Sequence, residues 1–167
     1  MHPLELVGVR VELPANQPIV LLKERDGVRY LPIWIGAVEA TAIAFALQGV
    51  ETSRPLTHDL IVDLFEAAGH TLDAVHITDL RDGTFYAQLV LTDRTGETIE
   101  VSSRPSDAIA IAARLPDVAL FSVSSVLDEA GVELDEDEDP VEARPEDQVR
   151  EFREFLDSVT PEDFREV

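Results

Sequence analysis

Polar residues stand near the expected starts of three helices, in segments that are otherwise mostly apolar. These residues are Glu39, Arg54, His58, Asp59, Arg104, Ser106 and Asp107. If the three helix starts lie together, they gather three carboxylates, one imidazole and two guanidinium groups. Carboxylate oxygens are the ligands that Mg²⁺ and Mn²⁺ prefer, and such an ion can activate water and neutralise a phosphate oxygen. Arginine can bind a phosphate through two parallel hydrogen bonds, so this set suits phosphate chemistry.

The same residues also have a purely structural interpretation. Acids in a first helical turn are favoured there because they cap backbone N–H groups and complement the helix dipole. Arg54 and Arg104 each precede a proline, and either side chain could pair with a nearby acid. Of the four histidines, His58 alone lies beside an acid at a helix start. Both interpretations stay open on these residues.

Several other chemistries find no support in the sequence. The chain has no cysteine, which excludes disulfides, thiolate catalysis and cysteine-bound zinc. It has no Gly-x-Ser-x-Gly motif, no glycine-rich phosphate loop and no dinucleotide fingerprint. The polar residues near the helix starts therefore remain the candidates for function.

The charge of the chain is strongly negative and unevenly distributed. Its 167 residues carry a formal net charge of −21, and residues 128–167 hold 17 of the 34 acids but 4 of the 13 bases. Proteins that hold nucleic acid by charge alone present a basic surface, which is missing here. Any affinity for nucleic acid is expected to be weak without bound cations.

Composition and hydropathy favour a cytoplasmic protein. Hydrophobic residues make up 45% of the chain, enough for a core. There is no apolar run of 18 residues, and Met1–Glu5 lacks a basic region followed by an apolar stretch. We therefore expect neither a membrane-spanning helix nor a signal peptide.

Alternating and helical patterns predict an α+β fold, with a mixed, largely antiparallel sheet and three main helices packed on it. Strands are expected at 4–13, 19–24, 28–35, 71–80, 84–92, 97–102 and 118–123, and helices at 37–48, 56–68 and 105–114, with a short one at 124–130. The near-continuous apolar run of 28–35 suggests a strand buried on both faces, although Pro32 places it at an edge or a bulge. Trp34 is expected in the core or at an interface.

Two details concern the second helix. Thr57 is the expected N-cap, and the expected apolar stripe consists of Leu60, Leu64 and Ala67 or Ala68. Beyond the main domain, 1–132, the crowded acids of 133–147 predict a linker, and 148–167 is expected to form a C-terminal helical appendage and tail.

Five segments together resemble the bifunctional nuclease domain family of bacteria and plants, and the chain looks like a bacterial member. They are Leu31–Gly36 with Glu39 and Ala40, then Arg54–Leu60, Thr84–Ala87, Ser103–Ala110 and Val126–Val132. The resemblance covers roughly residues 4–132, and its polar positions fall on residues already singled out.

The resemblance implies a metal-dependent nuclease that cleaves DNA and RNA, an α+β fold and a homodimer. On this hypothesis Glu39, Asp59 and Asp107 bind Mg²⁺ or Mn²⁺, and His58 is a general acid or base. Arg104 holds the scissile phosphate, with Arg54 and Ser106 as further binding residues. The apolar strand around Trp34 is the expected dimer contact. The alternatives are a non-catalytic module that binds an anion or nucleotide, and a protein-interaction module with an acidic tail.

Overall fold

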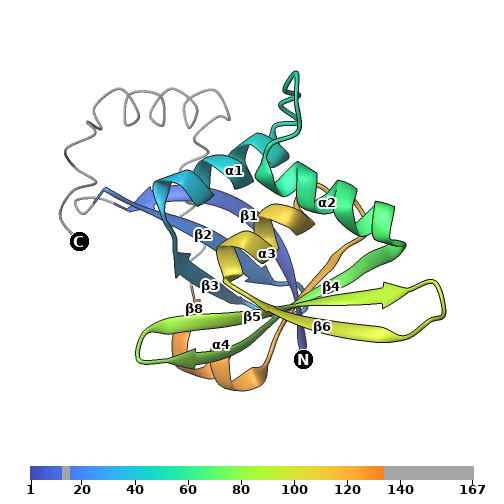
Figure 1. The fold of residues 1–167 in the computed structure, drawn as a ribbon. Helices are drawn as coiled ribbons and strands as arrows, with labels where there is room; N and C mark the ends of the chain where they lie inside the picture. The colour runs from blue at the N-terminus through green and yellow to red at the C-terminus, as the bar shows by residue number, and fades with distance from the viewer. Residues whose placement is uncertain (13–15, 134–167) are drawn as a thin grey trace. The chain divides into compact units, whose positions relative to one another are not determined.

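The computed structural model describes residues 1–12 and 16–133, which form an α+β body (Figure 1). The strands are β1 (His2–Glu12), β2 (Gln17–Glu24), β3 (Arg29–Trp34), β4 (His70–Arg81), β5 (Thr84–Asp93), β6 (Thr98–Ser103), β7 (Ala119–Ser122) and β8 (Val132–Glu133). The helices are α1 (Ala37–Leu47), α2 (Thr57–Ala68), α3 (Pro105–Ala112) and α4 (Ser124–Ala130). The fold class predicted from the sequence is confirmed.

All the strands belong to one sheet, in the order β6-β5-β4-β7-β1-β2-β3-β8. Every neighbouring pair is antiparallel except β4 and β7, which run parallel. The hairpin between β4 and β5 turns on Asp82 and Gly83, whose φ angles are 48° and 75°. Positive φ at both positions is the conformation of a tight hairpin turn, which Asp-Gly favours.

Helix α3 is the centre of the helical layer. It contacts α1 and α2 as well as strands β4 and β5, and in Figure 1 it lies beneath α1 and α2. Every α3 residue except Asp107 is buried. The alanine and isoleucine side chains that follow Asp107 in α3 form part of the single hydrophobic core. Asp107 is therefore the one α3 residue that faces a polar environment.

Strand β3 differs from its prediction. Leu31 and Ile33 are buried, whereas Trp34 is 52% exposed, so the strand alternates and buries one face rather than both. The prediction that both faces are buried was wrong because the outer face is filled by partly apolar side chains, those of Tyr30, Pro32 and Trp34. Pro32 does lie along an edge, since β8 pairs with β3 at Arg29 and Tyr30 and nowhere beyond. Two-residue β8 is too short to give a pattern, and it was missed.

Helix α2 corrects two further expectations. Its N-cap is Leu56 rather than Thr57, because the carboxylate of Asp59 accepts the Leu56 backbone N–H at 2.8 Å and fixes the start one residue earlier. Its packed face carries Ile61, Val62 and Phe65. Leu60 and Leu64 are 50% and 56% exposed, so the predicted apolar stripe was wrong. Apolar residues occur on both sides of this helix, which left its orientation ambiguous in the sequence.

The acidic linker and the C-terminal helix and tail fall at 133–147 and 148–167, outside the described residues except for Glu133. None of the described helices is both long and apolar enough to span a membrane.

Candidate active site

Arg104 joins two of the predicted acids. Its Nε and Nη2 donate to the two carboxylate oxygens of Asp107 at 2.7 and 2.9 Å, and its Nη1 lies 3.0 Å from Oε1 of Glu39. The Arg104 side chain is 66% exposed, whereas those of Asp107 and Glu39 are 31% and 20% exposed. The guanidinium therefore faces solvent, and the two carboxylates support it from the protein side.

The start of α3 produces this geometry. Arg104 is the N-cap, with extended backbone angles φ −72° and ψ 144°, and Pro105 occupies the first helical position. Proline suits that position because it has no N–H to satisfy. Asp107 comes three residues after the N-cap, and residues three apart at a helix start can pair. The Ser-Arg-Pro-Ser-Asp sequence thus builds the Arg104–Asp107 pair locally.

Glu39 reaches the pair from α1. It also comes three residues after the N-cap of its helix, which is Gly36. A Cβ atom at Gly36 would lie 2.2 Å from Oε2 of Glu39. The glycine therefore leaves the space through which the Glu39 side chain folds back over the start of α1.

His58 completes the cluster from α2. Its Nε2 lies 3.5 Å from Oδ1 of Asp107, and its side chain is only 14% exposed. Asp107 thus stands between an arginine and an imidazole. We call Glu39, His58, Arg104 and Asp107 the Arg104 cluster; it joins the starts of α1, α2 and α3, as the sequence hypothesis requires.

Asp59 has different partners. One of its carboxylate oxygens accepts the Leu56 N–H, and the other accepts Nε of Arg114. The Arg114 side chain is 10% exposed and also donates to the backbone carbonyls of Ala42 and Ala110, at 3.2 and 2.7 Å. Arg114 therefore ties α1, α2 and the end of α3 together beside the Arg104 cluster. Sequence reasoning missed it, because nothing local to Arg114 indicates a partner 55 residues away.

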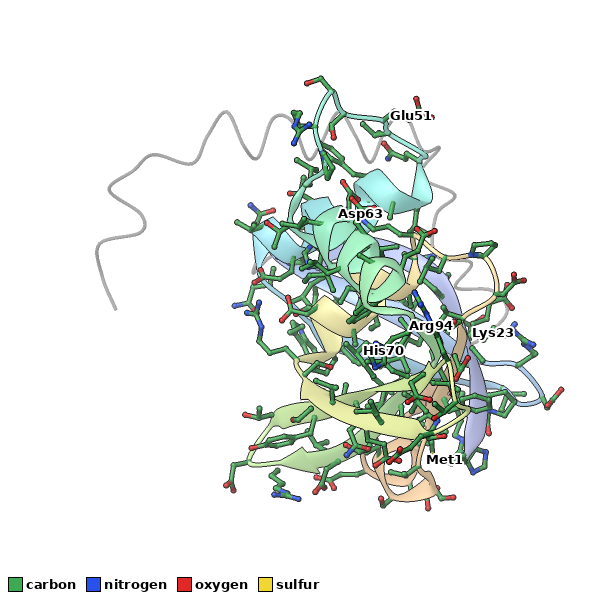
Figure 2. All side chains as sticks on the ribbon, turned by 45° about the vertical axis from the view of Figure 1, so that its right-hand side comes forward. Met1, Lys23, Glu51, Asp63, His70 and Arg94 are labelled. Atoms are coloured by element: carbon green, nitrogen blue, oxygen red, sulfur yellow. The ribbon has the colours of Figure 1, made fainter. Side chains whose placement is uncertain are left out.

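Two residues predicted to bind substrate, Arg54 and Ser106, have no described hydrogen bond or ion pair through their side chains. Ser106 is buried, with 6% of its surface exposed. Arg54 lies between α1 and α2, in the segment whose Glu51 projects beyond the helices in Figure 2, and it is exposed. Among the described residues no ion pair involves its guanidinium. Neither residue belongs to the Arg104 cluster by contact.

The ion pairs shift the titration of these groups. Burial by itself raises the pKa of Asp107, but the hydrogen bonds and charge of Arg104, helped by His58, outweigh it and hold that pKa below its usual value. The hydrogen bond from Arg114 lowers the pKa of Asp59. Asp107 and then Glu39 raise the pKa of Arg104. Asp59, Asp107 and Arg104 are therefore charged at neutral pH.

The predicted metal set is not assembled as a ligand group. Within residues 1–12 and 16–133, no three His, Asp or Glu side chains are placed to hold one ion. Glu39 and Asp107 share Arg104, and Asp59 is bound to Arg114. Their oxygens have the right chemistry for Mg²⁺ or Mn²⁺, but an ion would have to compete with an arginine for each of them.

Comparison with known proteins places these residues in a family context. The sequence matches the bifunctional nuclease domain over residues 20–135, which is more than half of the chain and includes every candidate site residue. Two Mycobacterium tuberculosis proteins, both described as uncharacterized, are each 53% identical to it over 99% of both chains. Bifunctional nuclease 2 of Oryza sativa subsp. japonica is 31% identical over 64% of this chain, and bifunctional nuclease 1 of Arabidopsis thaliana is 29% identical over 60%.

Those two matches span only 34% of the rice protein and 32% of the Arabidopsis protein. The domain match itself does not depend on them, because it covers the chain from β2 to β8. The resemblance seen in the sequence is thereby confirmed, and the chain belongs to the bifunctional nuclease domain family.

Proposed function

We propose that the protein hydrolyses phosphodiester bonds in DNA and RNA at the Arg104 cluster. One observation carries the proposal: an exposed guanidinium, two carboxylates and a nearly buried imidazole meet at the starts of three helices. Family membership supports the choice of reaction, since relatives with this domain carry the name bifunctional nuclease.

Arg104 binds the phosphate in this proposal. Its bidentate contact with Asp107 has the same fork geometry that arginine uses for a phosphate. Because the guanidinium is 66% exposed, a phosphate can approach it from solvent and share or replace the carboxylate contacts. Arg54, nearby in sequence to α2, is a candidate second cation for the phosphate or its neighbour.

His58 and Asp107 handle the proton. Hydrolysis removes one proton from the attacking water, forms a P–O bond to that water oxygen, breaks the bond to the leaving oxygen and returns a proton to it. His58 is the titratable group positioned for one of these transfers. Asp107, whose Oδ1 lies 3.5 Å from Nε2 of His58, orients the imidazole.

A divalent metal, Mg²⁺ or Mn²⁺, remains part of the proposal but not of these steps. Arg104 carries one positive charge against the two negative charges of Glu39 and Asp107, so without a further cation the cluster holds a phosphate only weakly. A bound ion would supply the missing charge and polarise the phosphate. We expect the affinity for nucleic acid to be weak in its absence.

The alternative function is non-catalytic binding of an anion or nucleotide. It is favoured by the saturation of all three acids, each of which already has an arginine partner. In that case the three helix starts are stabilised by the acids Glu39, Asp59 and Asp107. Arg104 then holds a ligand that is not cleaved.

Two further properties belong to the proposal. We propose that the protein is cytoplasmic. We also propose that it is a homodimer in which the outer face of β3 around Trp34 takes part in the contact, because this indole is 52% exposed and its strand lies near the sheet edge. Light scattering of the full chain at micromolar concentration tests the dimer. A purely monomeric species there rules it out.

The experiment that tests the reaction is a cleavage assay on labelled single-stranded DNA and RNA, with Mg²⁺, with Mn²⁺ and with EDTA. Wild type and Asp107→Ala are purified side by side, together with Asp63→Ala. Asp63 is an exposed acid on α2, visible in Figure 2, and it has no ion pair among the described residues. It is therefore a matched control for loss of one carboxylate.

We expect wild type and Asp63→Ala to cleave with metal, and Asp107→Ala to be strongly impaired. Equal cleavage by all three proteins would indicate a contaminating nuclease and refute the assignment. Tight binding of an oligonucleotide by wild type without any cleavage would favour the anion-binding alternative. Full activity in EDTA would remove the metal from the proposal and leave the site in place.

A further inference from the structure

A polar hollow lies on the opposite side of β5 from the core. Its volume is about 310 Å³, and it is lined by Thr78, Asp79, Arg81, Tyr86, Ala87, Gln88 and Ser102. Ala87 is 1% exposed and points into the core, so Tyr86 and Gln88, on either side of it, point to the other face of the strand. Ligand pockets begin at about 300 Å³, so the hollow is large enough for one small planar group.

Strand register brings the other lining residues to the same face. Gln88 of β5 is paired directly with Ser102 of β6, and residues opposite each other in a sheet share a face. An irregularity between Ile77 and Asp79 leaves Thr78 out of the regular pairing, and its hydroxyl lies 3.4 Å from the carbonyl of Tyr86. Such bulges commonly redirect side chains beside functional sites.

Tyr86 is the aromatic surface of the hollow. It is 39% exposed, while the preceding Phe85 packs against the core. The guanidinium carbon of Arg81 lies 5.0 Å from the centre of the Tyr86 ring, and Nε of Arg81 donates to Asp79 at 2.6 Å. Arg81 therefore lies over one face of the ring. An exposed aromatic ring with a cation over one face and amide and hydroxyl groups around it is a combination that binds unpaired bases.

The hollow and the Arg104 cluster contain residues that are close together in the sequence. Ser102 precedes Arg104 by two residues of extended chain, a separation of at most about 7 Å between their Cα atoms. Ala87 pairs with Ser103, the last residue of β6, and Arg104 follows it directly as the N-cap of α3. One strand of nucleic acid could therefore contact both places.

We propose that the hollow formed by Thr78, Arg81, Tyr86, Gln88 and Ser102 binds an unpaired base of a single-stranded nucleic acid whose phosphate is held at Arg104. The base stacks on Tyr86, and the amide of Gln88 and the hydroxyls of Thr78 and Ser102 meet its polar edge. This inference rests on the proposed function for the identity of the ligand. It adds a subsite that selects single strands, because a paired base is not free to enter.

The test compares binding of two labelled strands that differ only in their bases. One is a short single-stranded DNA, and the other has the same length but abasic sugars throughout. Fluorescence anisotropy with the full chain in EDTA, with gels showing that the strand stays uncut, measures the affinity for each. The variants are Tyr86→Ala, Tyr86→Phe and Gln88→Ala.

The matched control is Tyr30→Ala. Tyr30 also lies on a strand with a cation near its ring, since Nζ of Lys23 is 5.4 Å from its centre, but it does not line the hollow. Circular dichroism of each variant establishes that it is folded, and light scattering establishes that Tyr30→Ala, on the outer face of β3, keeps the oligomeric state of wild type. If Tyr86→Ala does not fold, Tyr86→Phe and Gln88→Ala still separate stacking from edge contacts.

We expect wild type to prefer the strand with bases, and Tyr86→Ala to weaken binding of that strand by at least about fivefold without changing the abasic strand. Tyr86→Phe and Tyr30→Ala should keep the preference, and Gln88→Ala should reduce it. Equal affinity of wild type for both strands, no measurable binding of either, or an unchanged preference in Tyr86→Ala overturns the subsite.

The subsite and the proposed reaction fail separately. Cleavage that depends on Asp107 together with an unchanged preference in Tyr86→Ala would keep the reaction and remove the subsite. A Tyr86-dependent preference for bases in a protein that cleaves nothing would keep the subsite and remove the reaction.

Discussion

Arg104 binds both carboxylate oxygens of Asp107, at 2.7 and 2.9 Å, and still exposes 66% of its side chain to solvent. The pair therefore resembles a phosphate site in which a carboxylate of the protein occupies the place of the ligand. A phosphate that binds Arg104 therefore has to share the guanidinium with this carboxylate or replace it.

Replacing Glu39 by glutamine tests that exchange. The change removes one of the two negative charges that compete for Arg104, so binding of single-stranded DNA in EDTA should become about two- to fivefold tighter. Anisotropy titrations of wild type and Glu39→Gln at one fixed salt concentration measure it. Weaker binding by the variant would mean that Glu39 contributes to the ligand site in another way.

Replacing His58 by alanine should lower kcat by about 10²- to 10⁴-fold and leave KM nearly unchanged, because the imidazole transfers a proton rather than binding the phosphate. His70→Ala is the matched control. His70 begins β4, is labelled in Figure 2, and makes no contact with the Arg104 cluster through any described hydrogen bond or ion pair. Steady-state kinetics on one oligonucleotide gives both constants. A loss confined to KM would remove His58 from proton transfer.

Arg114→Ala should destabilise the fold by about 1–3 kcal/mol, because it leaves the carbonyls of Ala42 and Ala110 and the carboxylate of Asp59 without their donor. Urea unfolding measures the free energy of unfolding. Arg25→Ala, which removes an exposed arginine with no described ion pair, should have little effect. A wild-type stability for Arg114→Ala would show that the three-helix contact contributes nothing.

The stability of the protein should fall in acid partly through Glu24. This carboxylate is 7% exposed, accepts two hydrogen bonds from Arg29 and lies 2.7 Å from His2. The Arg29 hydrogen bonds lower the pKa of Glu24. A lowered pKa in the folded state means that its stabilisation is complete above the unfolded pKa, about 4.3, and is lost as the pH falls through the folded value.

The difference in unfolding free energy between wild type and Glu24→Gln should therefore be largest near neutral pH and shrink below about pH 4. Urea titrations at a series of pH values measure this difference. If it stays constant down to the most acidic pH at which the protein folds, the lowered pKa is wrong.

The features that could be predicted from the sequence are those that depend on residues close together in the chain. The order of strands and helices follows from alternation, hairpin turns and the residues at helix ends, and the Arg104–Asp107 pair follows from a spacing of three residues at a helix start. Glu39, Asp59 and Asp107 all come three residues after an N-cap, which explains why the sequence made them look alike.

What distinguishes the three acids comes from the tertiary fold. Arg54 precedes Asp59 by five residues and Arg104 precedes Asp107 by three, so the two similar motifs place their arginines differently. Asp59 pairs instead with Arg114, whose position beside α2 depends on how α3 packs. The orientation of α2 and the hollow at Tyr86 likewise depend on which face meets the core, and a single sequence does not specify that.

The most direct measurement is the cleavage rate of Arg104→Ala on labelled single-stranded DNA, beside wild type and Arg25→Ala. If Arg104 binds the scissile phosphate, its loss should reduce cleavage by about 100-fold or more, since it removes the donors that meet the phosphate charge. Arg25→Ala, which loses the same charge elsewhere, should cleave at the wild-type rate. Cleavage by Arg104→Ala at the rate of wild type would contradict the assignment of the active site to this cluster.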